Sequence, residues 1–250
     1  MGHSDSKIAP QMSPQSVQRG VPNVLRATYK KGFSTKVLVY LGEPDREPIY
    51  SITVPGGWYG KLLLHDGPSA DSPILAGAET EGKWGSDYGI LLPNISVVET
   101  SNKEILRRKG KMKERFWFGM QVGEGPNRHI ERFEWRRSHG SEVKGVGEGK
   151  WGWKLVRLGH GSEEPCDDNP NDEPDRADGF TSDGKEVVAV WADSGDWKSM
   201  SKIGTFQLVG SGATNELGTQ WKLMALMTCL CFWQKMMRDT TTTATVAAVS

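Results

Sequence analysis

A run of basic side chains is the feature of this sequence best suited to bind a ligand. Residues 103–115, KEILRRKGKMKER, hold seven basic and two acidic residues. Near an anionic membrane, each lysine or arginine contributes about 1 kcal/mol of attraction. The run also fits a solvated loop whose charges only favour solubility. We expect a basic insert between strands and predict lipid binding by Lys103, Arg107, Arg108, Lys109, Lys111, Lys113 and Arg115.

The N-terminus offers a second signal for membrane attachment. Residues 1–6 match the N-myristoylation pattern, with Gly2 as the acceptor and Ser6 at the last position of the pattern. One acyl chain anchors a protein only marginally, and the basic insert would supply the second contact. Gly2 is therefore a lipidation candidate, with an unmodified polar tail as the alternative.

A second insert, at residues 163–183, carries the opposite charge, with nine acidic residues and three prolines. Its carboxylates invite comparison with a calcium-binding loop. The EF-hand spacing fails, however, because Arg176 stands at the third position when Gly179 occupies the sixth. We therefore expect a disordered acidic loop.

Charged residues also alternate along one predicted strand, at Glu131, Arg132, Glu134, Arg136 and Arg137. A pair of carboxylates on one sheet surface could act in acid–base catalysis. Cross-strand ion pairing is the preferred interpretation, because no nucleophile or base is linked to these carboxylates in the sequence.

The remaining candidates for chemistry have simpler interpretations. The five histidines are scattered, without the spacing of a metal site. Cys229 and Cys231 fall on different faces of a predicted helix and suit small core residues better than metal ligands. The sequence therefore predicts no catalytic residue, no metal and no cofactor, and hence a protein that is not an enzyme.

Composition sets the limits within which these features act. The chain has 250 residues, and its 31 basic residues balance its 31 acidic residues, so no global field attracts nucleic acid or a membrane. The three cysteines form no disulfide framework, and the N-terminus lacks the apolar core of a secretory signal. The apolar run at residues 223–233 is well short of the roughly 20 residues that span a membrane. We expect a cytoplasmic protein without a transmembrane segment, peripheral at a membrane if the basic insert binds one.

Strand-like segments make up most of the chain. Short runs of β-branched and aromatic residues recur between turns that contain glycine or proline. We expect one β domain at 25–238, ending in an apolar helix, between a disordered segment at 1–24 and a disordered tail at 239–250. The predicted strands lie at 34–41, 49–54, 61–64, 73–79, 88–93, 116–122, 129–137, 151–158, 185–192 and 204–210.

Five segments carry a resemblance to a known family. They are YGKLLLHDGPSADSPILA, RFEWRRS, WGWKLVRL, KEVVAVW and LGTQWKLMALMTCLCFWQ. In this order they resemble the fungal tubby-like C-terminal domain proteins, over about residues 34–237, and FEWRR at 133–137 is the most distinctive piece. The resemblance implies a mainly β fold, a closed antiparallel barrel of about 10–12 strands around a central hydrophobic C-terminal α-helix. The wider superfamily includes tubby proteins, which bind phosphoinositides, LURP-one proteins and the phospholipid scramblases.

Two functions follow from these features. The first is a non-enzymatic binding domain that attaches to an anionic lipid or phosphoinositide surface through residues 103–115. The alternative is a protein–protein interaction module without lipid activity, whose exposed loops, including the acidic insert, recognise another protein. Nucleic acid is not an expected partner, because the basic run contains no aromatic residue.

Overall fold

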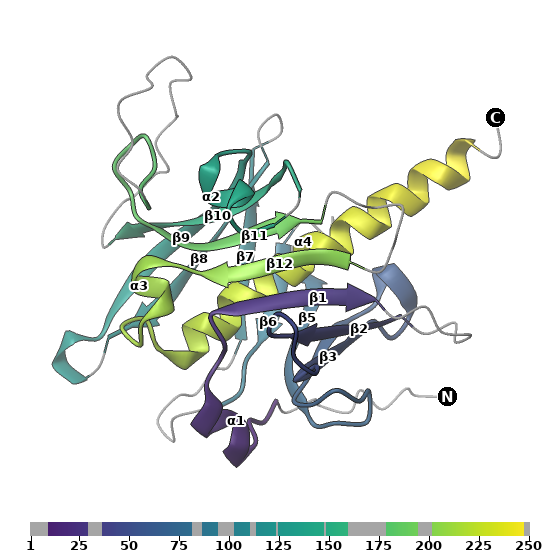
Figure 1. Ribbon diagram of the computed structural model, residues 1–250, viewed down its shortest axis with the longest axis horizontal. Coiled ribbons are helices and arrows are strands. Elements are labelled where there is room, and N and C mark those ends of the chain that lie inside the picture. Colours follow the sequence, from purple (N-terminus) through teal and green to yellow (C-terminus); the bar gives the residue numbers. More distant parts are fainter. Residues whose placement is uncertain are drawn as a thin grey trace.

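The chain folds mainly as β structure that closes on itself. In the computed structural model, twelve strands pair antiparallel and form a closed barrel (Figure 1). Each strand pairs with the next along the chain, and β1 pairs with β12 to complete the ring. The expectation of a closed antiparallel barrel is confirmed. The structure describes residues 10–29, 37–81, 87–94, 103–110, 114–123, 125–147, 149–159, 179–194 and 202–247.

The strands are short, and one helix is much longer than the others. The strands are β1 (Val24–Tyr29), β2 (Leu38–Gly42), β3 (Tyr50–Thr53), β4 (Leu62–His65), β5 (Ile74–Glu81), β6 (Asp87–Leu91), β7 (Lys103–Lys109), β8 (Arg115–Val122), β9 (His129–Ser138), β10 (Gly152–Gly159), β11 (Val187–Asp193) and β12 (Lys202–Leu208). The helices are α1 (Pro14–Arg19), α2 (Ser141–Lys144), α3 (Gly210–Ala213) and α4 (Gly218–Ala247), with 3-10 turns η1 (Gly57–Tyr59) and η2 (Gly125–Asn127).

The period-two pattern of the sequence is realised in the strands. In β8 the predicted inward residues Phe116, Phe118, Met120 and Val122 are all buried, and the residues between them are more exposed. The ten predicted strands correspond to β2–β6 and β8–β12. Strands β1 and β7 are additional, and they bring the ring to twelve.

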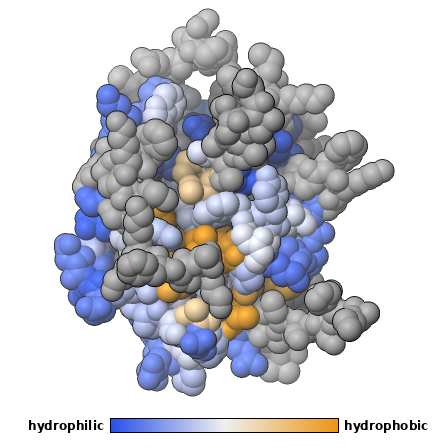
Figure 2. Space-filling view, turned by 90° about the vertical axis from the view of Figure 1, so that its right-hand side faces the viewer, coloured by the Kyte–Doolittle hydropathy of each residue, from blue (hydrophilic) through white to orange (hydrophobic). Residues whose placement is uncertain are grey.

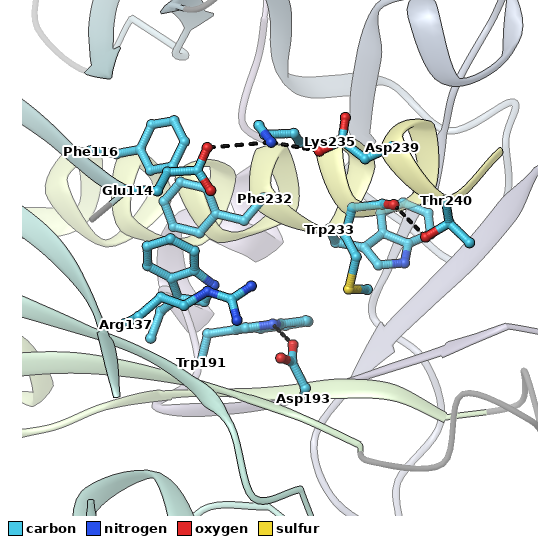
Figure 3. Close-up of a pocket in the computed structure, with 12 residues that line it drawn as sticks. Glu114, Phe116, Arg137, Trp191, Asp193, Phe232, Trp233, Lys235, Asp239 and Thr240 are labelled. Carbon is cyan, nitrogen blue, oxygen red and sulfur yellow. Dashed lines mark hydrogen bonds and ion pairs between the residues drawn. The ribbon is translucent and has the colours of Figure 1, made fainter. Parts of the chain in front are cut away.

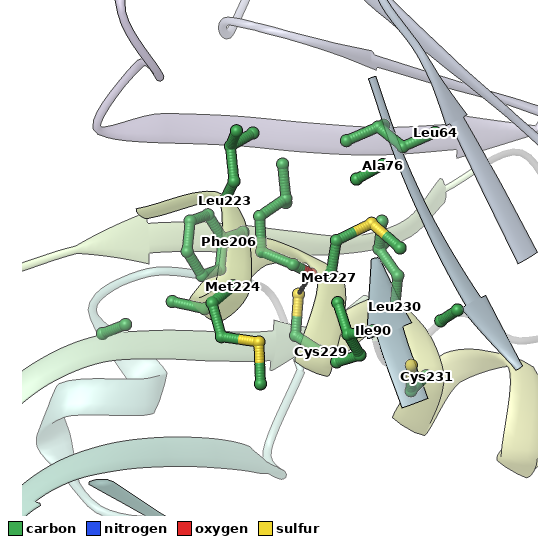
Figure 4. Packing of buried hydrophobic residues seen from close by; sticks show 14 of the residues in the cluster. Leu64, Ala76, Ile90, Phe206, Leu223, Met224, Met227, Cys229, Leu230 and Cys231 are labelled. Carbon is green, nitrogen blue, oxygen red and sulfur yellow. Dashed lines mark hydrogen bonds between the residues drawn. The ribbon is translucent and has the colours of Figure 1, made fainter. Parts of the chain in front are cut away.

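Helix α4 supplies a large share of the core. Every residue from 221 to 234 is buried, and the apolar ones belong to the same cluster as the inward residues of the strands. Figure 4 shows this helix beside Leu64, Ala76, Ile90 and Phe206, which come from β4, β5, β6 and β12. The predicted core roles of Cys229 and Cys231 are confirmed, because both are buried free thiols. Among the helices of the described residues, none is long and apolar enough to cross a membrane.

The N-terminal segment corrects one expectation. Disorder over residues 1–24 is wrong from residue 10 onward, where the chain forms α1 and enters β1. Ser13 caps α1 by accepting a hydrogen bond from the Ser16 amide, and its own amide donates to Asp66 Oδ2 at 2.8 Å. The Ser16 hydroxyl also bonds to Asp66. The helix is held by contacts with a distant turn, which composition does not show.

The structure also corrects the expectation of a disordered C-terminal tail. Helix α4 continues to Ala247, although disorder was predicted from residue 239. No glycine or proline interrupts the sequence after Gln234, so nothing ends the helix earlier. The ion pair of Lys235 with Asp239, at 2.6 Å, joins successive turns of this part of α4.

The predicted acidic insert falls largely outside the described residues. Its last part, residues 179–183, is described and forms a turn, so the expected disorder is wrong there. The Thr181 hydroxyl accepts a hydrogen bond from the Lys185 amide at 3.0 Å, and Asp183 pairs with Arg136 of β9 at 3.1 Å. These contacts fix the turn against the barrel wall.

Candidate functional site

Most of the described part of the basic segment at 103–115 lies in two paired strands, and the expectation of a solvated loop is wrong there. Residues 103–109 form β7, which pairs with β6 on one side and with β8 on the other. Leu106 anchors the strand, since it is fully buried and lies opposite the buried Tyr88. The ladders on both sides satisfy backbone groups that a loop would leave to water.

The two faces of β7 separate the predicted lipid-binding residues. Lys103, Arg107 and Lys109 alternate with the buried Leu106, so they lie on the outer face of the barrel. Arg108 lies on the inner side, where its Nε is 3.1 Å from the Glu114 carboxylate. Lys111, Lys113 and the lipidation candidate Gly2 lie outside the described residues.

Two arginines stack on one tryptophan on the outer face. Arg107 lies directly opposite Trp117 of β8, and its guanidinium carbon is 5.1 Å from the centre of the indole ring. Arg132 of β9 lies diagonally across from Trp117, and its guanidinium carbon is 5.3 Å from the ring. Both distances are within the range of cation–π attraction. Three adjacent strands thus hold an arginine–tryptophan–arginine stack.

Positive charge exceeds negative charge in this region. Arg115 pairs with the buried Glu134 at 3.3 Å, and Lys103 pairs with Glu81, whose hydrogen bond raises the pKa of the lysine. Arg107 and Lys109 make no ion pair with another residue that the structure describes. We call this surface the basic outer face and define it as Arg107, Lys109, Arg115, Trp117 and Arg132.

The alternating charges of β9 form cross-strand ion pairs, as predicted. Arg157 of β10 binds Glu131 through two nitrogens, at 2.6 and 2.8 Å, and His129 contacts the same carboxylate at 2.6 Å. Burial alone would raise the pKa of Glu131, but the hydrogen bonds from Arg157 and His129 outweigh it and lower the pKa. Glu134 pairs across the strands with Arg115 of β8 at 3.3 Å, and within β9 with Arg136 at 2.8 Å. The Glu131 carboxylate is held ionised, which suits a structural role rather than proton transfer.

Sequence reasoning did not include Trp117 and Arg132 in the site. A signal was present, because Trp117 stands between the inward residues Phe116 and Phe118 and must face outward at period two. Arg132 was interpreted only as a member of cross-strand ion pairs. Its position beside Trp117 follows from the register of β8 and β9.

Comparisons of the chain with family models, with curated proteins and with solved structures give no significant match.

Proposed function

We propose that this chain is a non-enzymatic binding domain of the tubby-like type, and that the basic outer face holds an anionic membrane surface. The observation that carries the proposal is the stack of Arg107 and Arg132 on Trp117, beside Lys109, which makes no ion pair with a residue that the structure describes. We also propose that the barrel encloses residues 221–234 of α4. The burial of residues 221–234 supports this, and a filled interior leaves the outer surface for binding.

The chemistry of the face suits phosphate headgroups. A guanidinium group donates two parallel hydrogen bonds to one phosphate, which a lysine cannot do. Stacking on Trp117 restrains the two arginines in advance, so less side-chain entropy is lost on binding. An indole is itself a favoured group at the membrane–water interface. A face built on three paired strands therefore fits a membrane better than a mobile loop of equal charge.

Vesicle co-sedimentation of the purified chain tests the proposal. We expect binding to vesicles that contain phosphoinositide or phosphatidylserine, and much weaker binding to neutral phosphatidylcholine vesicles. Binding should fall as salt is added, because exposed charges are screened over about 8 Å at physiological ionic strength. Free inositol phosphate should compete if a single headgroup is recognised, and should not compete if surface charge density is recognised.

Failure to bind any vesicle would contradict membrane attachment by the unmodified chain. It would favour the protein–protein interaction module, in which the same arginines contact acidic side chains of a partner. Binding that is equal for neutral and anionic vesicles would also count against the basic outer face, since it would indicate apolar insertion.

A further inference from the structure

A crevice opens at the end of the barrel beside the C-terminal half of α4. It has a volume of about 170 Å³, and aromatic side chains form part of its walls, with Trp153, Trp191 and Phe232 among them. Charged groups of β9, β11 and α4 also line it (Figure 3). Figure 2 faces the side of the molecule toward which α4 extends and shows apolar groups near its centre, between hydrophilic groups to the left and right. Aromatic walls with a few charged groups are typical of small-molecule sites.

Strand register explains how this lining is assembled. Trp153 lies opposite Arg137 on one neighbouring strand and opposite Trp191 on the other, so the three side chains form a row. The guanidinium carbon of Arg137 is 5.1 Å from the centre of the Trp153 ring. Asp193 lies two residues beyond Trp191 on the same face, and its Oδ1 accepts a hydrogen bond from the Trp191 indole at 2.9 Å.

The charged groups of the crevice differ in whether they have ion-pair partners. Lys235 is paired with Glu114 at 3.3 Å and with Asp239 at 2.6 Å. Arg137 makes no ion pair with a residue that the structure describes, and the Asp193 carboxylate hydrogen-bonds to the Trp191 indole alone among these residues. In Figure 3 Arg137 and Asp193 lie above and below Trp191. The guanidinium donors of Arg137 and the carboxylate of Asp193 therefore remain available to a ligand.

We propose that this crevice binds a small zwitterion, with the carboxylate of the ligand on Arg137 and its ammonium group on Asp193. The volume limits the size: a protein cavity of about 150 Å³ holds benzene, so this crevice suits about six to ten non-hydrogen atoms. Drug-sized ligands need at least roughly 300 Å³. Small α-amino acids combine the required size with both charges.

The surroundings favour such a ligand over a singly charged one. A carboxylate accepts two parallel hydrogen bonds from a guanidinium group, and Arg137 is already oriented by its stacking on Trp153. An ammonium group gains from the aromatic walls as well as from Asp193. The crevice lies on the inner side of the barrel end, whereas the basic outer face lies outside, so each proposal can fail without the other.

A matched series of probes tests the proposal. Isobutyrate keeps the carboxylate of L-alanine without its ammonium group, and isopropylammonium keeps the ammonium group without the carboxylate. Binding is followed by NMR through the indole N–H of Trp191, which is assigned with a Trp191→Phe variant. We expect a saturating shift with alanine and at least about tenfold weaker binding of each singly charged probe. No saturation with alanine, or equal binding of all three probes, would overturn the proposal.

Two variants assign the roles of the two charged residues. Arg137→Gln should weaken alanine binding at least about tenfold. Asp193→Asn should abolish the preference for alanine over isobutyrate, because asparagine keeps the acceptor for Trp191 but not the charge. Arg26→Gln, on the outer face of β1, is the matched control and should leave alanine binding unchanged. An Asp193→Asn variant that still prefers alanine would refute the assignment of the ammonium group.

Discussion

At the scale of single residues, the Asp193 carboxylate can bind a ligand, but its buried environment disfavours its ionised form. Burial raises its pKa, and the hydrogen bond from Trp191 and the charge of Arg137 offset this only in part. When a carboxyl group has a higher pKa in the folded state than in the unfolded state, the folded protein becomes less stable as the pH rises between the two pKa values. At neutral pH the folded protein therefore bears the full penalty of this charge.

Asp193→Asn should accordingly stabilise the protein at pH 7, because it removes a buried charge whose carboxyl pKa is raised by burial. Asparagine can accept the Trp191 hydrogen bond and needs no ionisation. The gain should shrink as the pH falls and vanish below the ordinary carboxyl pKa of 3.8, where Asp193 is protonated in both states. Denaturant unfolding at several pH values measures this difference. A variant less stable than the parent at pH 7 would show that the carboxylate has a stabilising partner.

At the scale of elements, a glycine in β12 makes room for a side chain of β11. Gly204 lies opposite Asp193, and a Cβ atom at this position would be 2.6 Å from Cζ2 of Trp191 and 2.7 Å from the Ala192 carbonyl oxygen. Both contacts are shorter than real Cβ atoms show, and one of them is to backbone. The close packing of β11 against β12 therefore depends on the absence of a side chain here.

Gly204→Ala should destabilise the protein by about 1–3 kcal/mol, because the Trp191 ring must move from its place in the sheet. Gly119→Ala in β8 is a matched control, since a Cβ atom there would meet its nearest neighbour at 3.6 Å. Thermal unfolding of the two variants makes the comparison. Equal stability of Gly204→Ala and the parent would contradict the packing described for Trp191.

The elements also show which parts of the fold a sequence can predict. Phe116 and Phe118 mark β8, because apolar residues at period two need a buried face. In β7 only Leu106 is buried, and the strand owes its existence to hydrogen bonds from β6 and β8. The crevice could not be predicted, because Arg137 and Asp193 belong to strands that β10 separates. Their proximity follows from register and barrel closure rather than from spacing in the sequence.

At the scale of the whole molecule, charge is balanced but unevenly placed. The chain has a net charge of zero, so a membrane can attract it only through one oriented surface. The basic outer face lies on β7, β8 and β9. In the ring of strands, four strands separate β8 from β1 in one direction and six in the other. Basic residues near β1 therefore offer a control on the opposite side of the barrel.

The most direct test compares two double variants that remove equal charge from opposite sides. Arg107→Gln with Lys109→Gln removes two charges of the basic outer face that make no ion pair among the described residues. Arg26→Gln with Arg46→Gln removes two exposed arginines, one in β1 and one in the turn after β2. Affinity for anionic vesicles is measured by co-sedimentation at one salt concentration. At about 1 kcal/mol for each charge, we predict that the first pair lowers affinity about 30-fold and the second pair has little effect. Equal losses from the two pairs, or no loss from the first, would contradict membrane binding through the basic outer face.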